Sequence, residues 1–233
     1  MSIQEKYKNK LFSILGDSIS TLDGYSKPDG ASYYEGEKRL EADVILPIDT
    51  WWGMLINHLG AKLLVNNSMS GSMVCKHRRC EIPSYGCSDE RTSSLGMDGK
   101  APDVIMVYLG TNDWGFGMKP TPNRKEYEND LDVFSVAYNT MLEKLKQSYP
   151  NAQIWCFTLC ASGFKNSRPV EFNFYPGGYH MDEYCKVIRK CASEHDCILI
   201  DLYNSVAPFD TVDGYHPNKH GMKTIFKGII AEL

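Results

Sequence analysis

Residues 10–18 read Lys-Leu-Phe-Ser-Ile-Leu-Gly-Asp-Ser, a short apolar run that stops at a glycine and two polar residues. An apolar run of this length that ends in turn residues predicts a buried β-strand followed by a tight turn. Four later segments have the same character. The ranges that we expect to form strands are 10–15, 62–66, 104–109, 153–159 and 197–202.

Segments with helical periodicity lie between these strands. Apolar residues recur at spacings of three and four within residues 50–59, 131–145, 181–191 and 222–230, which indicates amphipathic helices. The alternation of strand and helix favours right-handed crossovers and a mostly parallel sheet with helices on both faces. The sequence therefore predicts a three-layer α/β/α sandwich.

The composition is that of an ordinary globular protein. Apolar residues make up 42% and charged residues 23% of the 233 residues, and no repeat or linker divides the chain, so we expect a single domain over residues 1–233. The net charge of −4 lacks the basic excess of nucleic-acid-binding proteins. No stretch approaches the ~18 to 20 apolar residues of a membrane-spanning helix, and the first residues do not resemble a secretory signal. We therefore expect a cytoplasmic protein without a nucleic-acid partner.

Polar motifs follow four of the five predicted strands. In open α/β sheets ligands bind beyond the carboxyl ends of the strands, so these motifs should share one edge of the sheet. In chain order the motifs are Gly16-Asp17-Ser18, Asn66 through Gly71, Gly110-Thr111-Asn112-Asp113 and Asp213-Gly-Tyr-His216.

Together the motifs supply the groups that acyl transfer requires. A serine hydroxyl becomes a strong nucleophile when an imidazole takes its proton and a carboxylate orients the imidazole. Ser18, His216 and Asp213 can fill these roles. The oxyanion of the tetrahedral intermediate needs hydrogen-bond donors, which the backbone N–H groups of Ser18 and Gly71 and the side-chain amide of Asn112 can provide.

The four motifs resemble, in residues and in order, those of the SGNH or GDSL-type hydrolase family, and they span residues 14–218. This resemblance implies a flavodoxin-like sandwich, Ser18 as nucleophile, Asp213 and His216 as orienting acid and base, and Gly71 and Asn112 as oxyanion donors. It implies no cofactor and no metal. Ser68 stands where many members of the family have glycine, and an aromatic loop, Trp114-Gly-Phe116-Gly, follows the third motif.

Taken singly, each motif has a structural alternative. Gly16-Asp17-Ser18 suits any turn between a strand and a helix, and Gly71 or Asn112 could serve only in a turn. The presence of all four motifs in one order favours catalysis. A separate hypothesis is a zinc-binding interaction module, because thiolates and an imidazole occur close together. Its ligands would be Cys75, His77, Cys80 and Cys87.

The predicted activity is that of a serine esterase. We expect it to cleave a small acyl ester, such as an acetyl ester, of a polar alcohol such as a carbohydrate. Aromatic residues in the loops beyond the strands are candidates for substrate contact: Tyr25, Tyr33, Trp114 and Phe116. The alternatives are a lipase, lysophospholipase or thioesterase of the same family, and a catalytically silent carbohydrate-binding protein on this scaffold.

Overall fold

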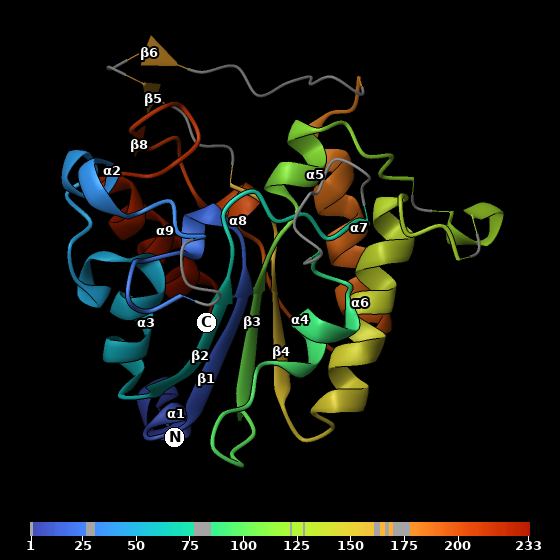
Figure 1. Cartoon of the computed structure of the whole chain (residues 1–233), viewed down its shortest axis with the longest axis horizontal. Helices are drawn as coiled ribbons and strands as arrows, with labels where there is room; N and C mark the ends of the chain where they lie inside the picture. The colour runs from blue at the N-terminus through green and yellow to red at the C-terminus, as the bar shows by residue number, and fades with distance from the viewer. Residues whose placement is uncertain are drawn as a thin grey trace.

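The computed structural model describes residues 2–26, 31–76, 85–121, 123–127, 129–160, 164–165, 168–169 and 178–233. Within these residues a five-stranded sheet forms the centre of the fold (Figure 1). Its strands are β1 (Leu11–Gly16), β2 (Lys62–Ser68), β3 (Val104–Tyr108), β4 (Gln153–Phe157) and β7 (Ile198–Ile200). They lie in the order β2-β1-β3-β4-β7, and every pair is parallel. The predicted parallel α/β sheet is thus confirmed.

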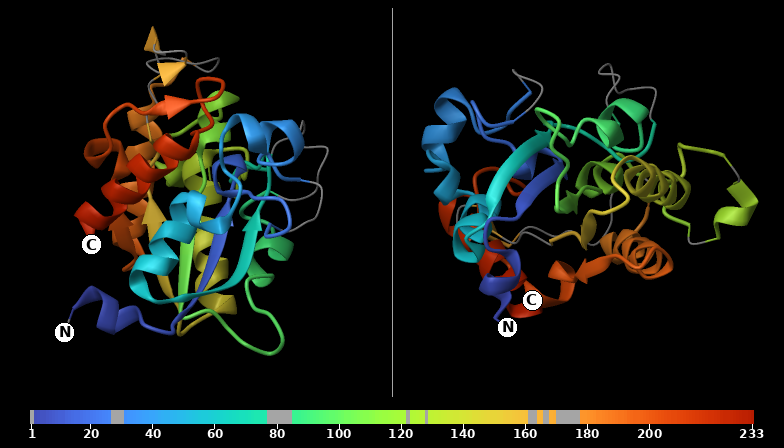
Figure 2. Two further views of the ribbon diagram at one scale, coloured as in Figure 1. Left: turned by 90° about the vertical axis from the view of Figure 1, so that its left-hand side faces the viewer. Right: turned by 90° about the horizontal axis from the view of Figure 1, so that it is seen from below.

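Both faces of the sheet are buried under helices. The helices α3 (Trp51–Leu59) and α9 (Lys219–Glu232) cover one face, and α6 (Phe134–Ser148) and α7 (Met181–Glu194) cover the other (Figure 2). Side chains alternate between the two cores along each strand. On β3, Ile105 and Val107 pack under α6 and α7, whereas Met106 and Tyr108 pack under α3 and α9. This double burial explains why the strands are continuous apolar runs in the sequence.

Local sequence fixes the ends of the covering helices. Thr50 precedes α3, and its hydroxyl accepts the backbone N–H of Gly53 at 3.0 Å. The same helix ends at Gly60, whose φ of +61° suits a residue without a Cβ. Asn218 caps α9 in the same way, because its side-chain oxygen accepts the N–H of Gly221 at 3.0 Å.

Short elements occupy the segments that the sequence leaves irregular. The helices among them are α1 (Ile3–Tyr7), α2 (Gly36–Glu41), α4 (Asp89–Ser93), α5 (Thr111–Gly115) and α8 (Leu202–Ser205), with 3-10 turns η1 (Ser18–Ser20), η2 (Pro47–Asp49) and η3 (Arg124–Tyr127). A second, small sheet joins β5 (Phe164–Lys165), β6 (Arg168–Pro169) and β8 (Asp210–Thr211). Elements of two to six residues carry too little periodicity to be predicted from an apolar pattern.

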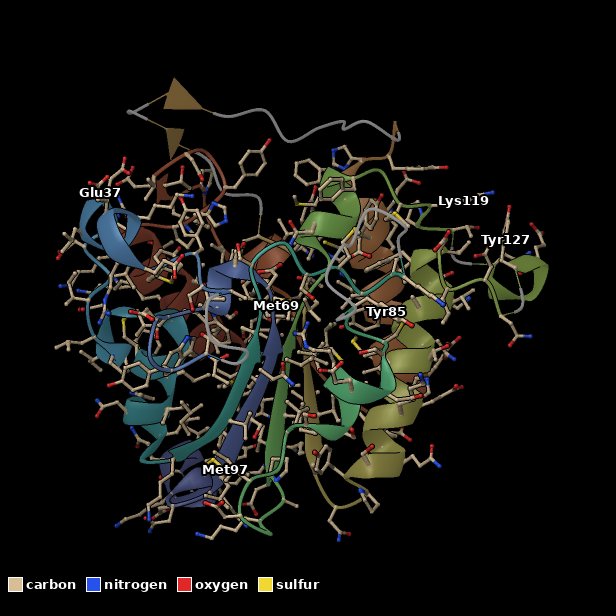
Figure 3. All side chains as sticks on the ribbon, viewed as in Figure 1. Glu37, Met69, Tyr85, Met97, Lys119 and Tyr127 are labelled. Atoms are coloured by element: carbon tan, nitrogen blue, oxygen red, sulfur yellow. The ribbon has the colours of Figure 1, made fainter. Side chains whose placement is uncertain are left out.

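The carboxyl ends of the central strands face one end of the molecule, where α5 and the small sheet also lie (Figure 1). Met69, which directly follows β2, lies on this side, whereas Met97 lies at the opposite end of the sheet (Figure 3). The described part of the chain contains no helix with the length and apolar character needed to cross a membrane.

Candidate active site

Ser18 lies in a tight turn immediately after β1. Asp17 caps this turn, because its Oδ1 accepts the backbone N–H of Ile19 at 3.0 Å. Gly16 allows β1 to lie close to its neighbours, since a Cβ at this position would lie 2.6 Å from Oγ of Ser68. The glycine and the aspartate therefore have local structural roles that present Ser18 at the end of the strand.

Asp213 organises the loop that leads into α9. Its Oδ1 accepts the backbone N–H groups of Tyr215 at 3.0 Å and His216 at 2.9 Å. Its Oδ2 lies 2.7 Å from Nδ1 of His216. Burial alone would raise the pKa of Asp213, but the hydrogen bonds from His216 and from the backbone N–H groups hold it well below its usual range. Asp213 is therefore a carboxylate at neutral pH.

The fold brings Ser18 and His216 into hydrogen-bond contact although 198 positions separate them in the chain. Oγ of Ser18 lies 2.8 Å from Nε2 of His216. Because an ionised carboxylate can only accept, Nδ1 of His216 carries the hydrogen that is shared with Asp213. In the neutral imidazole Nε2 is then free of hydrogen and accepts the hydroxyl of Ser18. This arrangement can withdraw a proton from the serine.

Asn112 lies at the start of α5, beside the loop that follows β2. Its Nδ2 donates to the carbonyl oxygen of Ser72 at 2.9 Å. Gly71 precedes Ser72 and has a φ of +76°, in the left-handed region that favours glycine. The Asn112–Ser72 bond thus holds the Gly71 loop against the third motif. A side-chain amide carries two hydrogens, so Asn112 has a second one to donate.

Asp113 reinforces this connection from within the protein. Its side chain is fully buried, and its two carboxylate oxygens accept the backbone N–H groups of Val74 at 2.9 Å and Cys75 at 3.0 Å. Burial nevertheless dominates and raises the pKa of Asp113 above its ordinary value. The loop after β2 is consequently anchored at two points by adjacent residues of α5.

A buried arginine that sequence reasoning missed joins the ends of two strands. Arg91, from α4, is 2% exposed. Its Nη1 donates to Oγ of Ser72 at 2.7 Å, and its Nη2 donates to the carbonyl oxygens of Gly16 at 3.0 Å and Asn67 at 2.7 Å. No motif marks Arg91, because it lies in a segment without apolar periodicity. Its guanidinium fixes the loops of Ser18 and Gly71 relative to each other.

Asp17 lies in the electrostatic field of this arginine and is 1% exposed. Burial raises the pKa of Asp17 to about 7, although Arg91 and the N–H of Ile19 act in the opposite direction. Burial also lowers the pKa of Arg91 to about 10, which leaves it cationic at neutral pH. A positive charge and a carboxyl that ionises near neutrality therefore lie beneath the Ser18 turn.

A pocket of about 280 Å³ opens at Ser18 and His216. None of its described lining residues is a lysine, arginine, aspartate or glutamate, and the ionisable side chains among them are those of Tyr215 and His216. The lining residues are Ser18, Ile19, Thr111, Asn112, Trp114, Gly115, Phe116, Tyr215 and His216. The sequence reasoning did not single out Ile19 or Tyr215, although both are direct neighbours of predicted catalytic residues.

The residues predicted to contact substrate divide into two groups. Trp114 and Phe116 line the pocket, with Trp114 1% and Phe116 51% exposed. Tyr25 is not among the described lining residues, and its ring lies 6.5 Å from that of Trp52. Tyr33 lies behind His216, with its ring stacked on the imidazole.

The zinc hypothesis depends on residues that are only partly described. Cys75 and Cys87 are buried, whereas His77 and Cys80 lie outside the described residues. Within the described ranges, no group of three or more histidine, cysteine, aspartate or glutamate side chains is arranged to hold a metal ion. Burial raises the pKa of the Cys75 thiol, and it raises the pKa of Cys87 to about 12. Both thiols are therefore protonated at neutral pH.

Comparison with known proteins gives one family. The sequence profile of GDSL-like lipases and acylhydrolases matches residues 10–169. Among proteins with curated descriptions, no sequence matches this chain. Similar solved structures include a protein described as a GDSL-like lipase from Bacteroides ovatus, with 27% identity and a TM-score of 0.72 over 96% of this chain and 97% of that one. Another protein of the same description, from Bacteroides uniformis, has 29% identity and a TM-score of 0.69 over 97% of this chain and 95% of that one. A carbohydrate acetylesterase from Sinorhizobium meliloti shares the fold, with 14% identity and a TM-score of 0.64 over 96% of each chain.

Proposed function

This chain belongs to the GDSL-like lipase/acylhydrolase family, and on that premise we propose that it is a serine esterase in which Ser18 is the nucleophile, His216 the general base and Asp213 the group that orients His216. One observation carries the proposal. The Ser18 hydroxyl, the His216 imidazole and the Asp213 carboxylate form a hydrogen-bonded series with heavy-atom distances of 2.8 and 2.7 Å. These are the contacts that proton withdrawal from a serine requires.

The proposed reaction has two steps. In the first, Oγ of Ser18 attacks the ester carbonyl while Nε2 of His216 takes the hydroxyl proton. His216 then gives this proton to the departing alcohol, which leaves an acyl group on Ser18. In the second step, a water molecule attacks the acyl group, His216 again takes and returns a proton, and the carboxylic acid is released.

Both tetrahedral intermediates place negative charge on the former carbonyl oxygen. The proposed donors to this oxygen are the backbone N–H groups of Ser18 and Gly71 and the second amide hydrogen of Asn112. Support comes from the bonds that hold these groups together. Asn112 and Arg91 both bond to Ser72, which adjoins Gly71, and Arg91 also bonds to the carbonyl of Gly16.

We further propose that the substrate is a small, neutral acyl ester of a polar alcohol. The pocket of about 280 Å³ is slightly smaller than the usual range of ligand sites, which is roughly 300–1,000 Å³. Apolar and aromatic side chains from Ile19, Trp114, Phe116 and Tyr215 contribute to its walls. Such walls suit a short acyl group or a ring. The lining residues that the structure describes include no lysine or arginine to bind a negatively charged substrate.

The test is hydrolysis of p-nitrophenyl esters of increasing acyl length, from acetate to octanoate, and of a panel of acetylated saccharides. Ser18→Ala should lower kcat by about 10⁴-fold or more, whereas Ser193→Ala on the exposed face of α7 should leave it unchanged. Acetate should be cleaved with a higher kcat/KM than octanoate. Equal activity of Ser18→Ala and the unmodified protein would refute the proposed nucleophile, and saccharide binding without hydrolysis would indicate a carbohydrate-binding protein instead.

A further inference from the structure

Tyr33 contacts both members of the Asp213–His216 pair. It lies in the segment before α2 and is 7% exposed. Its ring stacks on the imidazole of His216, with a centroid separation of 3.5 Å and an angle of 10° between the planes. Its hydroxyl donates to Oδ2 of Asp213 at 2.9 Å. One side chain therefore holds the imidazole by its face and the carboxylate by a hydrogen bond.

The hydroxyl of Tyr33 completes the hydrogen bonding of Asp213. Oδ1 accepts two backbone N–H groups, and Oδ2 accepts Nδ1 of His216 and the hydroxyl of Tyr33. A carboxylate offers about four acceptor positions, so these four donors fix both its plane and its rotation. Burial and the hydrogen bond to Asp213 raise the pKa of Tyr33 above its ordinary value, which keeps the phenol protonated and donating.

Tyr33 is also tied to the turn that carries Ser18. The backbone N–H of Tyr33 donates to Oγ1 of Thr21 at 2.9 Å, and this hydroxyl donates to the carbonyl oxygen of Ser18 at 2.8 Å. Both bonds are buried. The same residue thus connects the loop of the proposed base with the turn of the proposed nucleophile, which lie at opposite ends of the sequence.

Neighbouring side chains hold the Tyr33 ring in place. The ring of Tyr34 meets it edge-on, with centroids 5.0 Å apart and planes at 79°. Nζ of Lys38 lies over the Tyr33 ring, 4.6 Å from its centroid. Because the imidazole of His216 is in contact with one face of the ring, Lys38 takes the other. A phenol confined in this way can restrict rotation of the imidazole.

We propose that Tyr33 is a positioning residue for acyl transfer, which keeps the His216 imidazole aligned between Ser18 and Asp213 and limits the negative charge that Asp213 presents to the imidazolium. This inference rests on the proposed function of the same site. Small errors in the alignment of reacting groups lower kcat strongly, because the hydroxyl proton must pass along a nearly linear hydrogen bond. Tyr33 touches the base and its carboxylate, so its effect reaches the reaction through them.

The inference includes a pH dependence, whose sign follows from the charges around His216. Among the described residues, the charged and titratable groups that contact His216 or the side chains packed on it are Asp213 and Tyr215 on its own loop, Tyr33 and Tyr34 before α2, Lys38 and Glu41 on α2, and Asp17 in the turn of Ser18. The Tyr33 hydroxyl and Nδ1 of His216 share Oδ2 of Asp213. Without the hydroxyl, the negative charge of this oxygen attracts the protonated imidazole more strongly. Protonation of His216 then becomes easier, and the acid limb of kcat/KM moves to higher pH.

The experiment compares Tyr33→Phe, Tyr33→Leu and a matched control, Tyr7→Phe, with p-nitrophenyl acetate as substrate. Tyr7 is a suitable control because it is a buried tyrosine in α1 whose hydroxyl donates to Oε1 of Gln153, away from Asp213 and His216. Tyr33→Leu should lower kcat by about 10- to 100-fold with KM within about twofold. Tyr33→Phe retains the stacked ring, so it should keep most of kcat and move the acid limb upward by about half a pH unit. Tyr7→Phe should change neither kcat nor the acid limb.

The results separate this inference from the proposed function. If Ser18→Ala is inactive while both Tyr33 variants keep the unmodified kcat and acid limb, the positioning role is refuted and the esterase proposal stands. If Ser18→Ala is fully active, the esterase proposal itself is refuted. Should Tyr33→Leu fail to fold, Tyr33→Phe decides alone: an acid limb at the unmodified pH refutes the role, and an upward shift supports it.

Discussion

Replacing Asn112 with alanine tests the proposed oxyanion site more selectively than removal of the nucleophile. In the structure Nδ2 of Asn112 has one hydrogen on the carbonyl oxygen of Ser72, at 2.9 Å, and its side chain lines the pocket. The other amide hydrogen is the proposed donor to the oxyanion. Losing one such donor costs about 2.7–4 kcal/mol of transition-state stabilisation, or about 100- to 1,000-fold in kcat.

The same substitution removes the hydrogen bond to Ser72, and this second effect is small. A neutral, partly buried hydrogen bond contributes about 0.5–1.5 kcal/mol to folding, which corresponds to a few degrees in Tm for a chain of this length. Because Asn112 is proposed to bond the oxygen only when it becomes charged, KM should stay within about twofold. The expected result is a large loss in kcat in a protein that remains folded.

The assay is steady-state hydrolysis of p-nitrophenyl acetate, with Tm measured on the same preparations. The matched control is Asn57→Ala on the exposed side of α3, which removes an asparagine remote from the pocket. It should leave kcat and KM unchanged. If Asn112→Ala keeps more than about one third of the unmodified kcat, the decrease is far smaller than the loss of one oxyanion donor causes. That result would exclude Asn112 from the proposed oxyanion site.

Three further predictions concern the surroundings of the proposed nucleophile. The pKa of Asp17 is about 7 in the folded state and ordinarily about 3.9 in an unfolded chain, so the folded protein binds more protons and loses stability as pH rises from 4 to 7. The side chain of Asp17→Asn cannot ionise. Denaturation experiments should therefore show that the free energy of unfolding of this variant, relative to that of the unmodified protein, is higher at pH 8 than at pH 5 by about 2 to 3 kcal/mol. A difference that does not depend on pH would contradict this prediction. The lysine of Arg91→Lys cannot reproduce the planar set of hydrogen bonds to Ser72, Gly16 and Asn67. The substitution should lower the free energy of unfolding by about 3 kcal/mol and reduce kcat. A variant with unchanged Tm and kcat would refute the role of Arg91. Phe116→Ala should raise KM for aryl esters by roughly fivefold with little change in kcat, and an unchanged KM would show that this ring does not contact the substrate.

The parallel sheet could be predicted because its signals are local. Each central strand is buried on both faces and therefore appears as an apolar run in the sequence, as in Leu11–Gly16. The proximity of Ser18 and His216 could also be predicted from the sequence. Residues that follow parallel strands gather at one edge of the sheet whatever their separation along the chain.

Arg91 and Tyr33 could not be recognised in the same way, because their roles depend on groups that only the fold brings together. Arg91 is a charged residue in a five-residue helix, and its burial is stabilised by carbonyl oxygens at the ends of two different strands. Tyr33 appeared as a loop aromatic and was predicted to contact substrate. Its position behind His216 depends on the path of the chain before α2, which no local pattern encodes.

Covalent labelling with a fluorophosphonate tests most directly whether Ser18 is activated by His216. Intact-mass and peptide analysis should show one adduct per chain, attached to Ser18, in the unmodified protein. Ser18→Ala should remain unlabelled, and His216→Ala should react at least about 100-fold more slowly. Labelling of Ser18 at the same rate in His216→Ala, or an adduct on another residue in place of Ser18, would contradict the proposed mechanism.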